Sequence, residues 1–128
     1  MKIIIANSII LNRDTFRFNV ATLMPPFGMT RRGAFHRLKI VDGVIRDPNH
    51  VLDICWTQVN GELQNLKKHI SENTSDRRSR AILELSLESR NYVIGKVSEL
   101  FEKLKWTSVN GSDVGRVGAS KILFAVLP

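Results

Sequence analysis

The apolar residues that follow Val51 recur every three or four positions, and this spacing constrains the fold more than any other feature of the 128-residue sequence. At 3.6 residues per turn, such a pattern places its apolar side chains on one face of a helix. Its members are Leu52, Cys55, Trp56, Val59, Leu63, Leu66 and Ile70. A stripe this long must be covered by other elements, so we expect a mainly α fold, or α+β, with four to five helices around one core.

Two later segments repeat the helical spacing. The first begins near Ser75, which we predict as its cap, and runs to Trp106, with a division inside 86–91 where Ser89 or Asn91 starts a new helix. The second is a short apolar helix from Arg116 to Leu127.

The stretch around Phe16 is open to two interpretations. Phe16 and Val20 lie at helical spacing, with Asp14 available as an N-cap, whereas Phe16, Phe18 and Val20 also alternate as in a strand. We favour a helix, which the two prolines at 25–26 should end because the residue before a proline avoids the α region.

A small β-hairpin is predicted at 36–46. The runs "FHRLKIV" and "VIRD" flank Asp42-Gly43, a dipeptide that tolerates the positive φ angles of a tight turn. The next residues, 47–49, predict a turn and a cap for the helix that begins at Val51.

The composition fits a single domain spanning 1–128. Hydrophobic residues make up 43% of the chain and charged residues 24%, and the one cysteine, Cys55, excludes an internal disulfide and suits a reducing compartment. Polar Asn7 and Ser8 interrupt the apolar start of the chain, so we predict no signal peptide, and no run approaches the roughly 20 apolar residues that span a bilayer. We therefore expect a cytoplasmic protein without a membrane partner.

The apolar sequence "ILFAVLP" at 122–128 leaves two alternatives. Either Leu123, Phe124 and Leu127 dock into the core, or the chain is part of, or depends on, a larger assembly such as a homo-oligomer or a complex with a protein partner.

The chain is strongly basic, with a formal net charge of +7 and an isoelectric point near 10.1. Such an excess attracts phosphate polymers, DNA in preference to RNA in our interpretation, and makes their binding depend on salt. The alternative is that the cations form an ordinary solvated surface, and charge alone does not distinguish a nucleic acid from an acidic protein.

The sequence "GSDVGRVGASKIL" at 111–123 adds a motif. Gly115, Gly118, Ala119 and Ile122 stand at the spacing of a helix-hairpin-helix motif, with Asp113 in the place of its first glycine. Residues 93–127 therefore resemble this motif and are distantly similar to the helix-hairpin-helix DNA glycosylase fold and to related uncharacterised bacterial proteins.

The resemblance implies a hairpin at 113–118 that holds nucleic-acid backbone through exposed N–H groups. Val114, Gly115 and Gly118 would approach a phosphate, and Arg116 and Lys121 would add charge. Glycosylases with a catalytic lysine carry it where Val117 stands here, so the resemblance implies no glycosylase activity. The alternative is a purely structural hairpin in which Asp113 caps the final helix and the glycines allow close packing.

Two arginine clusters extend this prediction. Arg31 and Arg32 follow a proline–glycine loop, and Arg77, Arg78 and Arg80 lie near the start of a predicted helix. Cations at a helix N-terminus oppose the helix dipole, which favours a role in binding phosphate over a role in helix stability.

No arrangement of residues indicates catalysis. His36, His50 and His69 are scattered, so we predict no metal site and no cofactor. Cys55 lies on an apolar stripe as a buried thiol would, and Trp56 and Trp106 are predicted to be core aromatics.

The sequence thus favours a non-enzymatic nucleic-acid-binding protein that grips backbone phosphate through its helix-hairpin-helix-like turn. The second hypothesis is a protein–protein adaptor or inhibitor, of phage or mobile-element type, that places a basic face on an acidic partner.

Overall fold

The computed structural model describes residues 11–72 and 86–127, and this part of the chain is mainly helical, as predicted. Its elements in chain order are α2 (Arg13–Leu23), the 3₁₀ turns η1 (Pro25–Phe27) and η2 (Gly33–Phe35), β1 (Lys39–Val41), β2 (Val44–Arg46), α3 (Val51–Glu72), α4 (Leu87–Lys105), β3 (Ser108–Val109), β4 (Ser112–Asp113) and α5 (Gly115–Val126).

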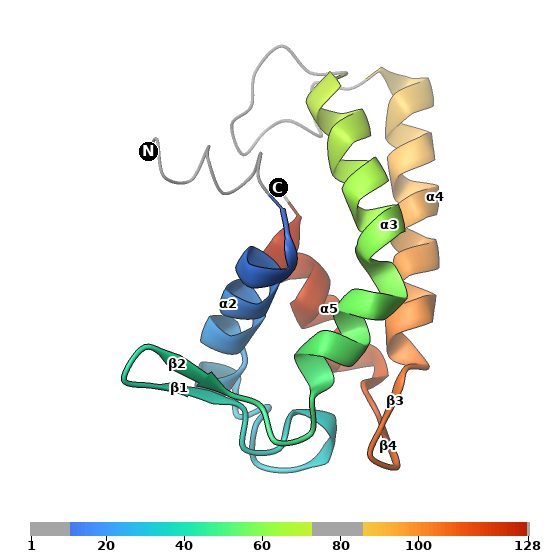
Figure 1. The fold of residues 1–128 in the computed structure, drawn as a ribbon. Helices are drawn as coiled ribbons and strands as arrows, with labels where there is room; N and C mark the ends of the chain where they lie inside the picture. The colour runs from blue at the N-terminus through green and yellow to red at the C-terminus, as the bar shows by residue number, and fades with distance from the viewer. Residues whose placement is uncertain (1–10, 73–85, 128) are drawn as a thin grey trace.

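The helices pack in two contacting pairs. α3 and α4 lie side by side and antiparallel (Figure 1). α2 and α5 contact each other next to this pair. α5 contacts both α4 and α2, and α2 also contacts α3, so all four helices surround one core.

The apolar stripe of α3 is the centre of this core. Its members Leu52, Cys55, Val59, Leu63, Leu66 and Ile70 are all buried. Trp56 is half-buried, and its ring centroid lies 5.2 Å from that of Phe16 on α2. The helical interpretation of the Phe16 region is therefore correct, because Phe16 and Val20 both face the core.

The helix caps correct the sequence analysis in two places. Asn12, not Asp14, caps α2, because its side chain accepts from the N–H of Thr15 while the Thr15 hydroxyl accepts from the N–H of Asn12. Ser86, not Ser89 or Asn91, caps α4 and so marks the start predicted inside 86–91. The expected cap Ser75 lies outside the described residues.

The carboxylate of Asp47 caps α3, as the 47–49 turn predicted. Its two oxygens accept from the N–H groups of Val51 and Leu52 at 3.1 and 2.9 Å. The same element is tied to α2 by Asp53, which accepts from Arg17 at 2.9 Å.

The described residues form two tight hairpins, and the sequence predicts one of them. β1 and β2 pair with Ile40 opposite Ile45, and Asp42 and Gly43 form their turn with φ angles of 52° and 76°. β3 and β4 pair in the same antiparallel way around Asn110 and Gly111, whose φ angles are 55° and 84°.

Lys67 of α3 caps the C-terminal end of α5. This side chain is buried, and its ammonium donates to the carbonyl oxygen of Val126 at 3.1 Å. Burial lowers the pKa of Lys67. The cation thus complements the negative end of a neighbouring helix rather than that of its own helix.

One prediction about the core is wrong: Trp106 is 67% exposed, in the position that directly follows the last residue of α4. The docking alternative for the C-terminal apolar residues holds in part, because Leu123 is buried and Leu127 packs against the core, whereas Phe124 is 76% exposed. Within the described ranges, none of the helices has the length and apolar character needed to cross a membrane.

Candidate nucleic-acid interface

The N-terminus of α5 differs from those of the other described helices in its capping. Side-chain oxygens of Asn12, Asp47 and Ser86 accept from the first turns of α2, α3 and α4. Val114 stands before α5 and offers no such acceptor, and the first turn of α5 carries no acidic residue. The N–H groups of Arg116 and Val117, which have no acceptor inside the helix, are therefore available to an anion.

The hairpin before α5 holds this helix end in place. The N–H of Val114 donates to the carbonyl of Thr107 at 2.9 Å, which closes the β3–β4 ladder just before the helix begins. The Thr107 hydroxyl in turn donates to the Lys103 carbonyl at 2.8 Å, so the hairpin is anchored on the last turn of α4.

The two motif glycines have different surroundings. Gly115 has a φ of +80°, and a Cβ built on it would meet nothing within 4 Å, so its backbone is open to solvent or to a ligand. Gly118 is buried, and a Cβ there would lie 2.9 Å from both Phe35 Cε2 and Val114 Cγ1. Gly115 thus fits the role of a phosphate-approaching residue, whereas Gly118 lets η2 pack against α5.

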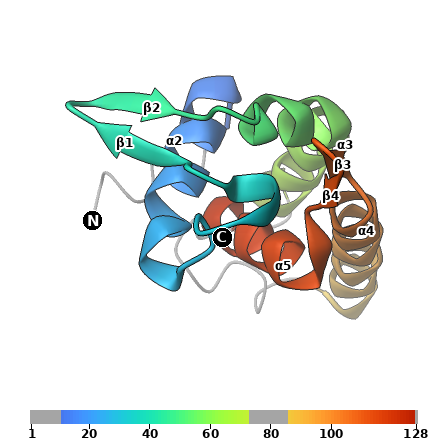
Figure 2. The same ribbon diagram turned by 90° about the horizontal axis from the view of Figure 1, so that it is seen from below.

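The loop that carries Arg31 and Arg32 lies against this end of α5. Phe35 of η2 contacts the Gly118 position, and the Asn49 amide donates to the carbonyls of Gly33 and Ala34 at 3.3 Å. Asn110, at the tip of the β3–β4 hairpin, donates to Asn49 at 2.9 Å. Seen from below, η2 lies next to the β3–β4 hairpin and the start of α5 (Figure 2).

Two of the predicted cations lie beside the same short turn. Arg31 and Arg32 are exposed, and the Arg31 guanidinium lies beside Gly28, within 3.6 Å of where its Cβ would stand. Gly28 directly follows Phe27, and the Lys121 ammonium lies 3.8 Å from the centroid of the Phe27 ring. Lys121 and Arg31 therefore both lie beside this turn, whereas exposed Arg116 stands in the first turn of α5, five positions before Lys121.

Glu102 lies near Arg116 on the α4 side. Its carboxylate accepts from Lys105 at 3.1 Å and from the indole N–H of Trp106 at 3.2 Å. The hydrogen bond from Lys105 is the largest cause that lowers the pKa of Glu102, and burial opposes it as the second largest. The charge of Lys105, the hydrogen bond from Trp106 and the charge of Arg116 lower this pKa further, in that order. Two cations thus surround one carboxylate, and the local charge stays positive.

The remaining predicted residues have separate outcomes. Val114 is buried, so it shapes the turn with its side chain turned inward. Asp113 is exposed on β4 opposite Ser108. The structural alternative predicted that Asp113 caps α5, but its side chain makes no capping hydrogen bond to that helix. Arg77, Arg78 and Arg80 lie outside the described residues.

Metal-binding side chains do not cluster in the described ranges. No group of three or more His, Cys, Asp or Glu residues is placed to hold a metal ion there. Cys55 is buried, and burial, with the charge of Asp47 adding to it, raises the pKa of its thiol to about 12. At neutral pH this thiol is protonated and unreactive.

The raised pKa of Cys55 predicts a loss of stability in alkali. The thiol of the unfolded chain ionises near its ordinary value of 9.0, so the folded state should lose about 1.4 kcal/mol per pH unit as the pH rises from there toward 12. Urea unfolding at pH 7, 9 and 10 should show this slope in the wild-type chain, and Cys55→Ala should lose it.

Lys67 acts in the opposite direction, because a buried ammonium with a lowered pKa favours folding as it loses its proton. Its contribution is common to both proteins, so the difference between wild type and Cys55→Ala isolates the thiol. Equal slopes in the two proteins would contradict the assignment.

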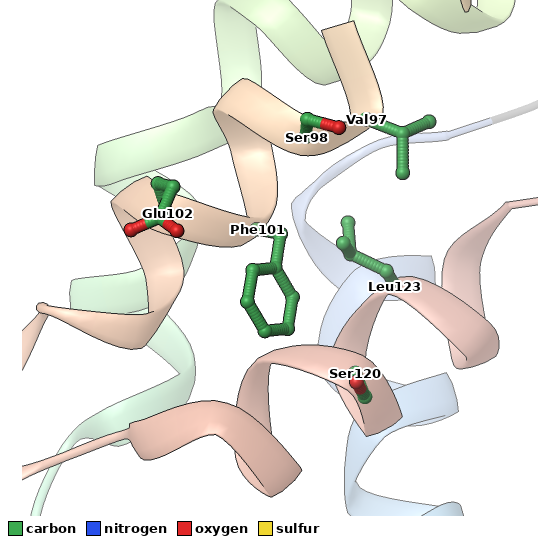
Figure 3. Close-up of a pocket in the computed structure, with 6 residues that line it drawn as sticks. All are labelled: Val97, Ser98, Phe101, Glu102, Ser120 and Leu123. Atoms are coloured by element: carbon green, nitrogen blue, oxygen red, sulfur yellow. The ribbon is translucent and has the colours of Figure 1, made fainter. Parts of the chain in front are cut away.

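A shallow apolar hollow lies between α4 and α5, with a volume of about 420 Å³. Its lining residues are Val97, Ser98, Phe101, Glu102, Ser120 and Leu123, with Phe101 and Leu123 turned toward each other across it (Figure 3). The hollow offers two hydroxyls and one carboxylate, which is a poor set for acid–base or nucleophilic chemistry.

Two features of the interface were missed in the sequence. The dipeptide Asn110-Gly111 is as strong a turn signal as Asp42-Gly43 and would have predicted the β3–β4 hairpin. Phe27, which lies beside Lys121 of α5, and Trp106, which follows α4, carry no sequence signal of their exposure.

Comparison with known proteins adds no family to this description: no protein-family model matches the chain, and neither does any curated protein or solved structure. The helix-hairpin-helix resemblance remains a prediction from the residues of 93–127.

Proposed function

We propose that this protein binds nucleic acid without acting as an enzyme, and that it holds a backbone phosphate at the start of α5. The observation that carries the proposal is an exposed arginine, Arg116, in the first turn of a helix that no side chain caps, with Lys121 further along the same helix and Arg31 on the turn beside Lys121. Backbone N–H groups and the positive end of the helix dipole favour an anion there, and the cations add long-range attraction.

The position of Arg116 supports this proposal independently of the motif. A cation in the first turn of a helix opposes the helix dipole, so Arg116 does not serve the stability of α5. An exposed guanidinium at this place does suit a phosphate, which accepts two parallel hydrogen bonds from it.

DNA is the expected polymer, held by its backbone and not by its base sequence. Phosphate contacts fix the position of a protein on nucleic acid but carry no sequence information. The formal charge of +7 would attract the polymer before these contacts form.

Charge reversal at Arg116 tests the proposal. Arg116→Glu should weaken the binding of a labelled DNA oligonucleotide at least tenfold in fluorescence anisotropy, since it removes one phosphate contact and adds a repulsive charge. The variant should stay folded, because a carboxylate in the first turn is favoured by the helix dipole.

Lys68→Glu is the matched control. Lys68 is exposed near the far end of α3, and its reversal changes the net charge by the same amount. Asp113→Asn should act in the other direction and tighten binding, since it removes a carboxylate next to the site. Equal weakening by Arg116→Glu and Lys68→Glu would show that only the overall charge matters and would overturn the site.

A second candidate function is favoured by the hollow between α4 and α5 and by the exposed ring of Phe124. A protein partner could cover these apolar surfaces, in addition to the basic face that the adaptor hypothesis places on an acidic partner. A chain that stays folded but binds no nucleic acid would make this the better explanation.

A further inference from the structure

Two aromatic side chains near the proposed phosphate site are exposed to solvent but are held in position by neighbouring groups. Phe27 is 55% exposed and Trp106 is 67% exposed. Scattered exposed apolar residues are common on protein surfaces, so exposure alone indicates nothing. Each of these two residues is held in place by its neighbours and lies next to a cation. Tyr92 also lies next to a cation, Lys96, but near the opposite end of α4 from Trp106.

Trp106 is fixed by the edge of its indole ring. Its Nε1–H donates to Glu102 Oε2 at 3.2 Å, and Lys105 Nζ lies 5.1 Å from the ring centroid. The indole N–H lies in the plane of the ring, so this hydrogen bond leaves the face away from Lys105 open to another molecule.

Phe27 is fixed by its backbone. It ends the 3₁₀ turn that Pro25 and Pro26 begin, and Gly28 follows it with a φ of +71°. Lys121 Nζ lies 3.8 Å from the ring centroid, so the ring also has a cation on one side. Little conformational freedom would be lost if a flat group stacked on the exposed part of this ring.

The two rings lie beside different parts of α5. Phe27 is in contact with Lys121 in the middle of the helix, whereas Trp106 donates to Glu102, which also feels the charge of Arg116 in the first turn. Arg116 and Lys121 are five positions apart on the helix, which turns their side chains about 140° from each other. Each of these two cations therefore has an exposed aromatic ring on its own side of the helix.

We infer, on the basis of the proposed function, that the preferred polymer is single-stranded. Its bases would stack on Phe27 and Trp106, and its phosphates would be held between these two rings. Exposed aromatic rings interleaved with cations bind unpaired bases, because every base has a face that can stack. In a duplex the faces of the bases are covered by their neighbours, so a surface that uses stacking favours a single strand.

Tryptophan fluorescence tests this directly. The chain has two tryptophans, so Trp56→Phe leaves Trp106 as the only one. Titration with an oligothymidylate should quench Trp106, since a stacked base quenches the indole. A duplex of the same length and heparin, which has no bases, should bind with little quenching.

Alanine variants measured by anisotropy separate stacking from charge. Phe27→Ala and Trp106→Ala should each weaken binding of the single strand about tenfold and leave duplex and heparin binding within about twofold. Phe18, which is 56% exposed on α2, provides the matched control, and Phe18→Ala should change none of the three.

The possible results distinguish the stacking inference from the proposed function. Unchanged single-strand affinity in both alanine variants, or equal affinity of the wild type for single strand and duplex, would overturn the stacking inference. The proposed function would survive that result if Arg116→Glu still weakened binding more than Lys68→Glu. Both proposals fail if the wild-type chain binds none of the three polymers.

Discussion

Gly118→Leu is expected to lower the free energy of unfolding by about 3 kcal/mol, which is a large part of the stability of a small domain. Even a Cβ at this position would stand 2.9 Å from Phe35 Cε2 and from Val114 Cγ1. Both neighbours are buried, so they have little space into which to move. Gly118→Ala should cost less, about 1 kcal/mol, because alanine regains part of the loss through its helix propensity.

Two other helical glycines provide controls with the opposite sign. Gly61 on α3 and Gly95 on α4 are exposed, and a Cβ on either would meet nothing within 4 Å. Gly61→Ala and Gly95→Ala should therefore each stabilise the protein by about 0.5–1 kcal/mol in urea unfolding. Stabilisation by Gly118→Ala of the same size would contradict the packing of η2 on α5.

Neutralising the arginines of the interface is expected to have the largest effect on function. In the triple variant Arg31→Gln, Arg32→Gln and Arg116→Gln, the Kd for a DNA oligonucleotide at about 0.1 M salt should rise by roughly two orders of magnitude or more. Each phosphate contact contributes roughly 0.9 to the slope of log K against log salt, so the loss of three contacts removes most of the affinity that low salt provides. All three side chains are exposed, so the fold should be retained.

A second triple variant matches the first in charge. Lys39→Gln, Arg46→Gln and Lys68→Gln change exposed residues on β1, β2 and α3. Each triple removes three positive charges and leaves a formal net charge of +4 from +7. A loss of affinity in the second triple as large as in the first would mean that binding has no local site.

The helices could be predicted because their cause is local. The stripe from Leu52 to Ile70 specifies both the element and its buried face, and Asp42-Gly43 specifies a turn by the φ angles it tolerates. The caps were harder, since Asp14 and Asn12 are both good caps and only the backbone of the first turn selects between them.

The arrangement of the interface could not be predicted, because it depends on contacts between distant segments. Asn49 links η2 to Asn110, which lies 61 positions later in the chain. Gly118 shows the same limit: the motif suggests a ligand-binding glycine, but the ring of Phe35 fills the space beside it. Trp106 was assigned to the core by its residue type, although its place just after α4 exposes it.

The most direct measurement is the Kd of the wild-type chain for a labelled DNA oligonucleotide over a series of salt concentrations. With phosphate contacts from Arg31, Arg32, Arg116 and Lys121, log K against log salt should fall with a slope of roughly −3 to −4 for a duplex and roughly −3 for a single strand. The Arg31, Arg32 and Arg116 triple variant should reduce the size of that slope by roughly 2 to 3. Affinity that does not change with salt, or no binding at the lowest salt concentration, would contradict the account.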